Sequence, residues 1–345
     1  AALGGLLAIA VVAGAAWAWA PRPEPAGTAR IAVVQAGVVA GPDARFARGE
    51  RLTRTLKGRG VDLVVWGESS VGTDLTRRAD LRARLAALSR EVGADLLVNV
   101  DARRTGRPGI YKSSVLIGPD GPTGDRYDKM RLVPFGEYVP ARALLGWATS
   151  VGKAATEDRR RGTRQVVMET ASESSPGLRF GPLVCFETAF PDMSRRLVRD
   201  GAGLLVAQSS TSTFQDSWAP GQHASLAALR AAETWRPMVH ATLTGVSAVY
   251  GPDGAPIGGQ LATDRATAAV YELPLAHGTS PYVRFGDWPL YAALLALAAY
   301  CLRTGVRALR PPSAQAPDDR STELPAHQPV TRTVRFLRRP RPAPR

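Results

Sequence analysis

Three short segments of the chain carry side chains with complementary chemistry. One apolar stretch ends abruptly at Glu68, a loop-like segment holds Lys129 and then Glu137, and a second apolar stretch ends at Cys185. A thiol with an ordinary pKa of about 8.5 is mostly protonated at neutral pH and needs a base to become a nucleophile. A carboxylate can take that proton, and an ammonium group stabilises a thiolate or an oxyanion. The set of Glu68, Lys129 and Cys185 therefore predicts covalent acyl transfer.

Each segment also fits an ordinary structural interpretation. Glu68 can be a solvated loop residue, the segment Tyr127–Tyr138 can be a packed structural loop, and most cysteines of folded proteins are inert. Cys185, however, ends an apolar strand just before a helix expected to begin near Pro191. This order is typical of a nucleophile elbow, where backbone N–H groups can face a developing oxyanion.

Cysteine and histidine usage argues against a metal centre. The sequence has two cysteines, Cys185 and Cys301, with no CxxC pair and no Cys/His spacing typical of zinc. His223, at the start of an expected helix, and His240, in an apolar strand, are interpreted as structural histidines. We therefore expect no metal ion at the site.

The middle of the chain, residues 29–277, alternates strand-like and helix-like pieces, which favours a layered α/β domain. Helices are expected at Leu75–Val92 and Gln222–Trp235, and Asp253-Gly254 predicts a turn between the strand-like stretches Ala248–Tyr250 and Ala255–Ile257. The other expected strands are Arg30–Gln35, Val61–Trp66, Asp95–Val100, Val115–Gly118, Gln165–Met168, Pro182–Phe186, Leu204–Gln208 and Val239–Thr244.

Two apolar segments flank this domain. Residues 1–20 contain no charge, which predicts a transmembrane helix; a signal-peptide core is the alternative. Residues 286–303 predict a second, C-terminal span, for which a buried core helix is the alternative. Arginines that follow it indicate that residues 304–345 lie in the cytoplasm and the α/β domain on the extracytoplasmic side. Because the chain begins without Met inside an apolar segment, we expect it to be the C-terminal portion of a larger membrane protein.

The strong positive charge is concentrated at the C-terminal end. The net charge is +14, and the residues from Arg303 onward contribute ten arginines against three acidic residues. A Pro- and Arg-rich segment of this kind is typical of a solvated, disordered tail. We therefore predict a basic cytoplasmic tail and no nucleic-acid-binding face.

Several motifs together resemble the nitrilase, or carbon-nitrogen hydrolase, superfamily and, more narrowly, the C-terminal portion of the apolipoprotein N-acyltransferase family. The resemblance runs from about Arg30 to Leu302 and is most specific in the block from Tyr127 to Pro140. The other matching motifs are Val184-Cys185-Phe186-Glu187, Gln222-His223 with Arg230, Arg236-Pro237, Thr244-Gly245, Ser280-Pro281-Tyr282 and Gly286-Asp287-Trp288-Pro289-Leu290.

The resemblance implies an α-β-β-α sandwich flanked by transmembrane helices in the bacterial plasma membrane. It implies that Glu68 is the general base, that Lys129 stabilises the oxyanion and that Cys185 becomes acylated. Glu137, Glu187 and Phe186 would be supporting active-site residues. The reaction implied moves a fatty acyl group from a phospholipid to Cys185 as a thioester, and then to the N-terminal amine of a diacylglyceryl-cysteine apolipoprotein, without a cofactor.

Departures from the family pattern leave two alternatives open. Gly67 stands where the family usually has Pro, Phe186 where Tyr is common, and Ser210-Thr211 where Asn-Asp is common. One alternative is a membrane-tethered amidase or nitrilase that transfers the acyl group to water. The other is a catalytically inactive paralogue that serves as a binding protein, in which Cys185 never becomes acylated.

Overall fold

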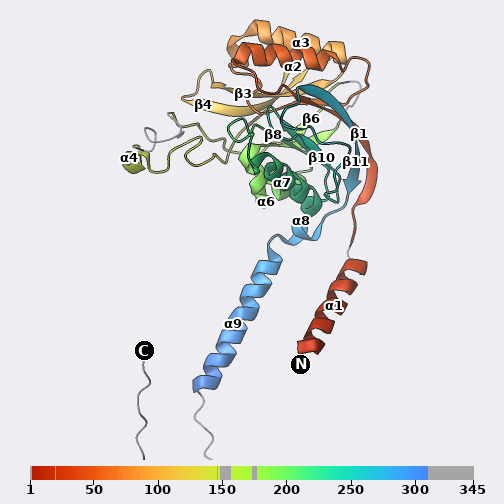
Figure 1. Ribbon diagram of the computed structural model, residues 1–345, viewed down its shortest axis with the longest axis vertical. Helices are drawn as coiled ribbons and strands as arrows, with labels where there is room; N and C mark the ends of the chain where they lie inside the picture. Colours follow the sequence, from red (N-terminus) through yellow and green to blue (C-terminus); the bar gives the residue numbers. More distant parts are fainter. Residues whose placement is uncertain (1, 20, 146, 148–156, 173–176, 310–345) are drawn as a thin grey trace, which may run out of the picture. The chain divides into compact units, whose positions relative to one another are not determined.

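A computed structural model describes residues 2–19, 21–145, 147, 157–172 and 177–309 (Figure 1). The chain divides into two units, residues 1–288 and residues 289–345. The first unit contains every strand found among the described residues. The expected tail, residues 304–345, lies outside the described residues beyond position 309.

The first unit contains two β-sheets. The first sheet has six strands in the order β11-β1-β2-β3-β4-β5, in which β1, β2 and β3 are parallel to one another and the other pairings are antiparallel. Its strands are β1 (Glu24–Gln35), β2 (Leu63–Trp66), β3 (Asp95–Arg103), β4 (Ile110–Gly118), β5 (Gly121–Asp128) and β11 (Thr267–His277).

The second sheet has five strands in the order β10-β9-β8-β7-β6. Here β7, β8 and β9 are parallel, and the two edge pairings are antiparallel. The strands are β6 (Met168–Glu169), β7 (Arg179–Val184), β8 (Leu204–Ser209), β9 (Met238–Thr242) and β10 (Ala248–Tyr250). Both sheets therefore place three parallel strands at their centre.

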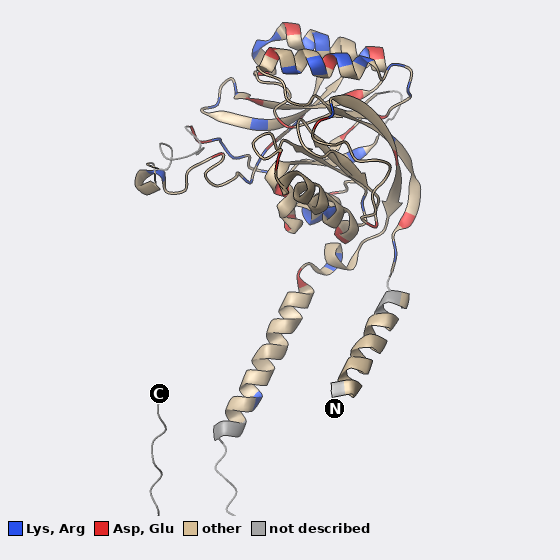
Figure 2. Cartoon of the chain, in the orientation of Figure 1, with Lys and Arg blue, Asp and Glu red and all other residues tan. Residues whose placement is uncertain are grey.

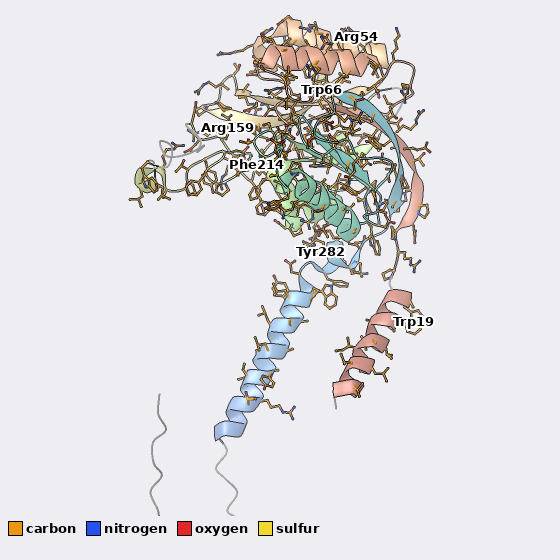
Figure 3. All side chains as sticks on the ribbon, in the orientation of Figure 1. Trp19, Arg54, Trp66, Arg159, Phe214 and Tyr282 are labelled. Atoms are coloured by element: carbon orange, nitrogen blue, oxygen red, sulfur yellow. The ribbon has the colours of Figure 1, made fainter. Side chains whose placement is uncertain are left out.

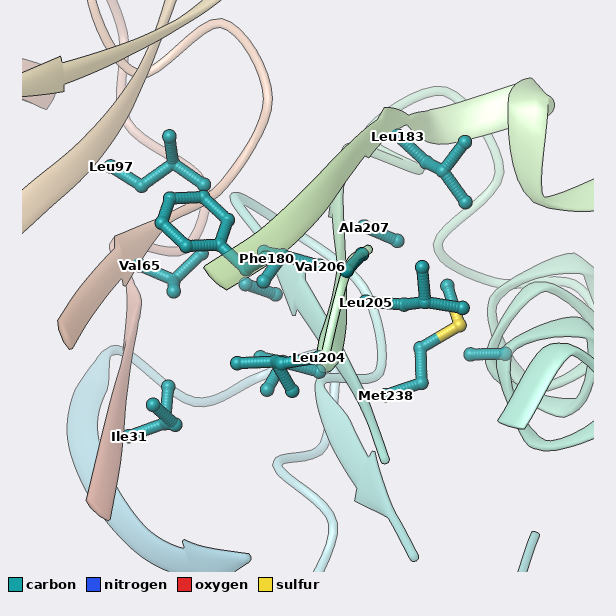
Figure 4. Packing of buried hydrophobic residues seen from close by; sticks show 14 of the residues in the cluster. Ile31, Val65, Leu97, Phe180, Leu183, Leu204, Leu205, Val206, Ala207 and Met238 are labelled. Atoms are coloured by element: carbon teal, nitrogen blue, oxygen red, sulfur yellow. The ribbon is translucent and has the colours of Figure 1, made fainter. Parts of the chain in front are cut away.

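Alternation along the central strands builds two cores, one on each face of the first sheet. Ile31 and Val33 of β1 belong to the core that contains the second sheet, whereas Ala32 and Val34 belong to the core shared with the outer helices. Successive side chains of a strand point to opposite faces, so an uninterrupted apolar strand serves both cores at once. Figure 4 shows the core between the sheets, where Val65 and Leu97 lie near Phe180.

Helices cover the outer face of each sheet and complete four layers. Those on the first sheet are α2 (Pro42–Arg54) and α3 (Ala79–Val92), with the short 3₁₀ helix η1 (Leu75–Arg77) before α3. Those on the second sheet are α6 (Pro191–Arg199) and α7 (Ala219–Thr234), with the 3₁₀ helix η2 (Cys185–Ala189) between β7 and α6. The expected α-β-β-α sandwich is confirmed.

The remaining helices are α1 (Ala2–Trp19), α4 (Arg142–Leu145), α8 (Pro281–Phe285) and α9 (Trp288–Leu309). Within the described residues, one helical stretch is long and apolar enough to cross a membrane, Trp288–Val306 of α9, and its side chains are exposed. The apolar stretch of α1, Leu3–Ala15, is shorter than such a span. Lysine and arginine side chains are concentrated on α2 and α3 and are sparse along α9 (Figure 2).

The expected elements agree with the structure except at a few places. The expected helix Leu75–Val92 is divided into η1 and α3, and the expected strand at Gln165–Met168 is reduced to β6. Ala255–Ile257 forms no named strand, although Ile257 N–H donates a backbone hydrogen bond to Val249 O across the predicted turn. The pattern did not predict α2, β5 or β11.

The carboxyl ends of the central strands of the two sheets are joined by hydrogen bonds. Gln208 of β8 donates through Nε2 to Trp66 O at 2.8 Å and to Leu97 O at 3.1 Å, and the N–H of Glu68 donates to Ser209 O at 3.1 Å. Gly67 lies within this junction, and a Cβ atom there would lie 1.9 Å from the backbone nitrogen of Leu243. Only glycine therefore fits between Trp66 and Glu68 in this backbone arrangement.

We expect Gly67→Ala to destabilise the protein by about 1–3 kcal/mol or more, because backbone atoms must move to admit the methyl group. Thermal unfolding in detergent checks this. The matched control is Gly221→Ala, because a Cβ atom at Gly221 in α7 meets no heavy atom within 4 Å. The control should leave the unfolding temperature unchanged or higher, since alanine favours helix. Equal unfolding temperatures for Gly67→Ala and wild type would contradict the close packing of the strand ends.

Candidate active site

Parallel strands bring two of the predicted residues to one edge of the sandwich. Glu68 follows β2 in the first sheet, and Cys185 follows β7 in the second. Ser209 ends β8 next to β7, and its carbonyl oxygen accepts the N–H of Glu68. The carboxyl ends of parallel strands are where α/β folds place reactive groups.

The backbone is strained where the site is built. Ser69, Phe135 and Cys185 have φ of 57°, 62° and 50°, a left-handed conformation that residues other than glycine rarely adopt. Ser69 follows Glu68, and Phe135 lies two residues before Glu137. Strain of this kind persists when the surrounding structure enforces it, and it collects at functional sites. At Cys185 it turns the chain from β7 directly into η2, as expected for a nucleophile elbow.

The loop after β5 brings in Lys129 and Glu137. Lys129 is buried, and its Nζ lies 2.8 Å from Glu137 Oε1 and 3.4 Å from Glu68 Oε1. The other oxygen of Glu137 accepts the N–H of Val133 at 2.9 Å. Burial alone would lower the pKa of Lys129, but the charges of Glu68, Cys185 and Glu137 outweigh it and raise the pKa. Lys129 is therefore a permanent cation.

Glu187 joins the loop after β5 that carries Lys129 (the lysine loop) to the turn at Cys185 (the cysteine turn). Its Oε1 accepts hydrogen bonds from Tyr127 OH at 2.7 Å, Met130 N–H at 2.7 Å and Arg131 N–H at 3.0 Å, and its Oε2 accepts the N–H of Val184 at 2.8 Å. Burial raises the pKa of this carboxyl above its usual value, against the opposing effect of these donors. One side chain thereby binds Tyr127, Met130 and Arg131 on the two sides of Lys129, and Val184 just before Cys185.

A second lysine, Lys112 of β4, also reaches Glu68. Its Nζ lies 3.2 Å from Glu68 Oε1, 3.2 Å from Asp101 Oδ2 and 2.8 Å from Ser69 Oγ. Burial would raise the pKa of Glu68, but Lys112, Lys129 and the hydrogen bond of the Cys185 thiol lower it to about 2. Glu68 is therefore ionised at neutral pH. The sequence pattern does not single out Lys112, because it lies in the first half of β4, before the apolar residues that mark this strand.

The thiol of Cys185 is partly buried and protonated at rest. Burial and the nearby carboxylate of Glu68 raise its pKa to about 12, against the opposing charge of Lys129. For this thiol to act as a nucleophile, a neighbouring group would have to take its proton. Figure 3 draws the described side chains and labels Trp66, which ends β2 two residues before Glu68.

His223, interpreted from the sequence as a structural histidine, lies next to Cys185. Its Nε2 is 3.6 Å from Cys185 Sγ, and its Nδ1 is 2.9 Å from His240 Nε2. The interpretation of His240 as a core residue is correct, because its side chain is fully buried and its Nδ1 is 3.0 Å from Val246 O. Helical spacing was the available signal for His223, since Ala227 and Ala231 follow it on the buried face of α7.

The structure thus gathers Glu68, Lys129, Glu137 and Cys185 around one point, with Glu187 behind them. Phe186, in the same turn as Cys185, packs edge-to-face against Phe190 at 5.0 Å between ring centroids. No group of His, Cys, Asp and Glu side chains with the geometry of a metal site occurs among the described residues.

Comparison with known proteins identifies related enzymes. The chain is 34% identical over 260 residues to an apolipoprotein N-acyltransferase of Geobacter metallireducens, which covers 74% of this chain and 49% of the relative. It is 31% identical over 241 residues to an apolipoprotein N-acyltransferase of Methylococcus capsulatus, covering 69% of this chain and 46% of the relative. The chain spans about half the length of the curated relatives it matches.

Solved structures show the same fold at lower identity. The NitFhit protein of C. elegans gives a TM-score of 0.58 at 19% identity, covering 72% of this chain and 61% of that chain. An amidase from Nesterenkonia sp. AN1 gives a TM-score of 0.53 at 18% identity, covering 77% and 97%. The sequence profile of carbon-nitrogen hydrolases matches residues 30–279. Together with the sandwich and its site, this match shows that the chain belongs to the carbon-nitrogen hydrolase family.

Proposed function

We propose that this chain carries the catalytic part of a membrane-bound N-acyltransferase with a Glu68–Lys129–Cys185 triad. It would move a fatty acyl group from a phospholipid to the N-terminal amine of a diacylglyceryl-cysteine apolipoprotein. The observation that carries the proposal is the buried cluster in which the Lys129 ammonium lies 3.4 Å from Glu68, beside a strained Cys185. The similarity to apolipoprotein N-acyltransferases supports this choice of reaction.

In the first half-reaction, the Cys185 sulfur attacks the ester carbonyl carbon of the phospholipid while the thiol proton passes to Glu68. The carbonyl oxygen becomes an oxyanion, which the Lys129 ammonium stabilises in a site of low dielectric constant. The C–O bond to the glycerol backbone then breaks, and the leaving alkoxide takes the proton. The products are a lysophospholipid and a thioester on Cys185.

In the second half-reaction, the amine nitrogen of the apolipoprotein attacks the thioester carbonyl carbon. The amine gives its proton to Glu68, the C–S bond breaks, and the sulfur recovers a proton. The products are an amide and the free thiol. Because one carboxylate serves both halves, Glu68 must stay ionised between them, and its low pKa supports this role.

Three further residues would support the triad. Glu137, which holds Lys129 at 2.8 Å, would keep the ammonium aimed at the oxyanion. Glu187 would act as a positioning residue, because it fixes the backbone on both sides of the site. Phe186, which packs on Phe190, would shape the wall next to the nucleophile.

We further propose that residues 29–277 form the catalytic domain and that α1 and α9 anchor it in the bacterial plasma membrane. The exposed leucines of α9 support this, because a soluble helix would bury such an apolar surface. Arg303 and Arg307 near the end of α9 support a cytoplasmic tail and an extracytoplasmic catalytic domain. Both substrates carry lipid chains, so a site held at the bilayer surface meets them at high local concentration.

A hydrolase that passes the acyl group to water is the second candidate. The same triad serves amidase chemistry, and the amidase fold of Nesterenkonia sp. AN1 resembles this sandwich. The two candidates share the acyl-enzyme and differ in the acceptor. An inactive paralogue, the third alternative, would form no acyl-enzyme.

We expect phospholipid alone to add one fatty acyl mass to the full chain in membranes, through a bond that hydroxylamine cleaves. Cys185→Ser should lose this thioester signal, whereas Cys301→Ser, the matched change at the exposed cysteine of α9, should keep it. Intact-protein mass spectrometry makes the measurement. Absence of any mass gain in folded wild-type protein would sink the proposal.

Adding a diacylglyceryl-cysteine peptide to the isolated acyl-enzyme separates the two active candidates. An N-acyltransferase discharges the thioester faster with the peptide than with buffer and yields an acylated peptide. Equal discharge rates with free fatty acid as the product would favour the hydrolase.

We expect Lys112→Met to shift the acid limb of Cys185 acylation upward by about 1–3 pH units, because Glu68 then loses one of its two neighbouring cations. The acid limb moves upward because Glu68 accepts a proton only above its own pKa. That pKa is about 2 in the wild type and is expected to be higher in the variant. The pH dependence of the initial acylation rate measures this. Lys57→Met, at an exposed lysine, is the control. An unmoved acid limb in folded Lys112→Met would show that Lys112 does not tune the base.

A further inference from the structure

A chain of hydrogen bonds leads from Cys185 into the second sheet. It runs from Sγ to His223 Nε2 at 3.6 Å, from His223 Nδ1 to His240 Nε2 at 2.9 Å, and from His240 Nδ1 to Val246 O at 3.0 Å. A carbonyl oxygen can only accept, so His240 carries its proton on Nδ1. Neutral His240 then accepts at Nε2, and His223 donates from Nδ1. The remaining nitrogen, His223 Nε2, therefore presents a lone pair to the Cys185 thiol.

Both imidazoles are neutral at rest. Neutral rings are required if His223 donates to His240 and still has a lone pair on Nε2. His240 is fully buried in β9, and burial together with the adjacent His223 lowers its pKa to about 3. Burial also lowers the pKa of His223, with Lys129 acting in the same direction, while Glu68 and the backbone of Cys185 oppose it. A histidine with its neutral form stabilised but with a carboxylate nearby can accept a proton transiently.

The other acceptor near the thiol, Glu68, is held by two ammonium groups. Lys112 and Lys129 lie 3.2 Å and 3.4 Å from the same oxygen, Oε1. Two close cations make a carboxylate a weaker base, because protonating it would leave both cations without that partner. The lone pair of His223 Nε2 faces the Cys185 thiol and is not paired with two ammonium groups in this way.

We propose that His223 is a second catalytic proton acceptor for the Cys185 thiol, and that His240 is the positioning residue that fixes its tautomer. When Cys185 attacks, the S–H bond breaks, the sulfur electron pair forms the S–C bond, and the proton moves to His223 Nε2. The imidazolium returns that proton to the leaving oxygen when the tetrahedral intermediate collapses. This inference rests on the proposed role of Cys185 as the nucleophile.

The charged and titratable groups that act on His223 come from four elements. They are Cys185 of η2, His240 of β9, Glu68 after β2 and Lys129 after β5. Glu68 favours the imidazolium of His223, whereas Lys129 favours its neutral form. Formation of a thiolate–imidazolium pair leaves the total charge of the site unchanged, which a buried site tolerates better than the loss of a proton to solvent.

Alkylation of Cys185 by iodoacetamide tests the proposal without any lipid, with peptide mass spectrometry to separate Cys185 from Cys301. Only the thiolate reacts, so the rate reports how readily the thiol loses its proton. We expect His223→Gln to lower the rate at neutral pH by about tenfold or more and to make the rate rise more steeply with pH than it does in wild type. Wild type should show a shallower profile. His277→Gln, at the exposed histidine that ends β11, should match wild type.

Variants of His240 separate positioning from folding. The amide oxygen of His240→Gln can still accept the His223 Nδ1 proton, so this variant should keep most of the reactivity, whereas His240→Leu should lose it to the extent that His223→Gln does. If His223→Gln fails to fold, His223→Ala with added imidazole replaces it, and restored alkylation supports the proposal. A wild-type rate and pH profile in folded His223→Gln would overturn it.

The test also distinguishes this inference from the proposed function. An alkylation defect in His223→Gln, combined with no acylation of wild type by phospholipid, would keep the proton acceptor and reject the acyltransferase. Acylation of wild type by phospholipid, combined with unchanged alkylation in His223→Gln, would keep the acyltransferase and reject His223 as a proton acceptor.

Discussion

The buried ammonium group of Lys129 is the charge on which the site depends. An unpaired cation at this depth would cost several kcal/mol, so the fold must supply anions to it. Glu137 and Glu68 do so from a loop and from the end of β2, at 2.8 Å and 3.4 Å. Removing either carboxylate leaves a buried charge incompletely paired, which makes the three residues one unit rather than separate contributors.

That unit is held in place by the ends of the central parallel strands. The junction of Gly67 with Leu243 and the hydrogen bond between Glu68 and Ser209 fix Glu68 relative to the second sheet. Glu187 fixes the lysine loop relative to the cysteine turn through four accepted hydrogen bonds. Gly67 is therefore a requirement of close packing in this chain.

The sequence indicated the parts of the site that follow apolar strands, because an apolar strand that ends in a reactive side chain is a local pattern. Lys112 was missed because it lies in the first half of β4, before the apolar residues that marked that strand. His223 was assigned a structural role because nothing local shows what lies across from α7. Contacts between segments far apart in the chain depend on the packing of the two sheets, and spacing along one segment does not contain them.

The missed elements have related causes. The helix α2 carries few apolar residues. Phe46 enters the core beneath it, Leu52 packs against that core, and arginines occupy much of the rest of the helix. β11 contains Pro274, which is compatible with its position at the edge of the sheet but lowers any strand prediction. In both cases the long-range partner, β1 for β11 and the first sheet for α2, decides the structure over the local pattern.

Charge balance links the fold to the chemistry. Glu68, Glu137 and Asp101 face the cations Lys112, Lys129 and Arg159, so the buried ionic cluster is close to neutral before any reaction begins. A thiolate or an oxyanion formed there adds a negative charge unless a proton stays within the site. An internal proton acceptor avoids that cost, and the two groups next to the Cys185 sulfur, Glu68 and His223, are the ones placed to accept. The strained turn at Cys185 then follows from the same requirement, because it holds the sulfur between an anion at the end of one sheet and an imidazole packed on the other.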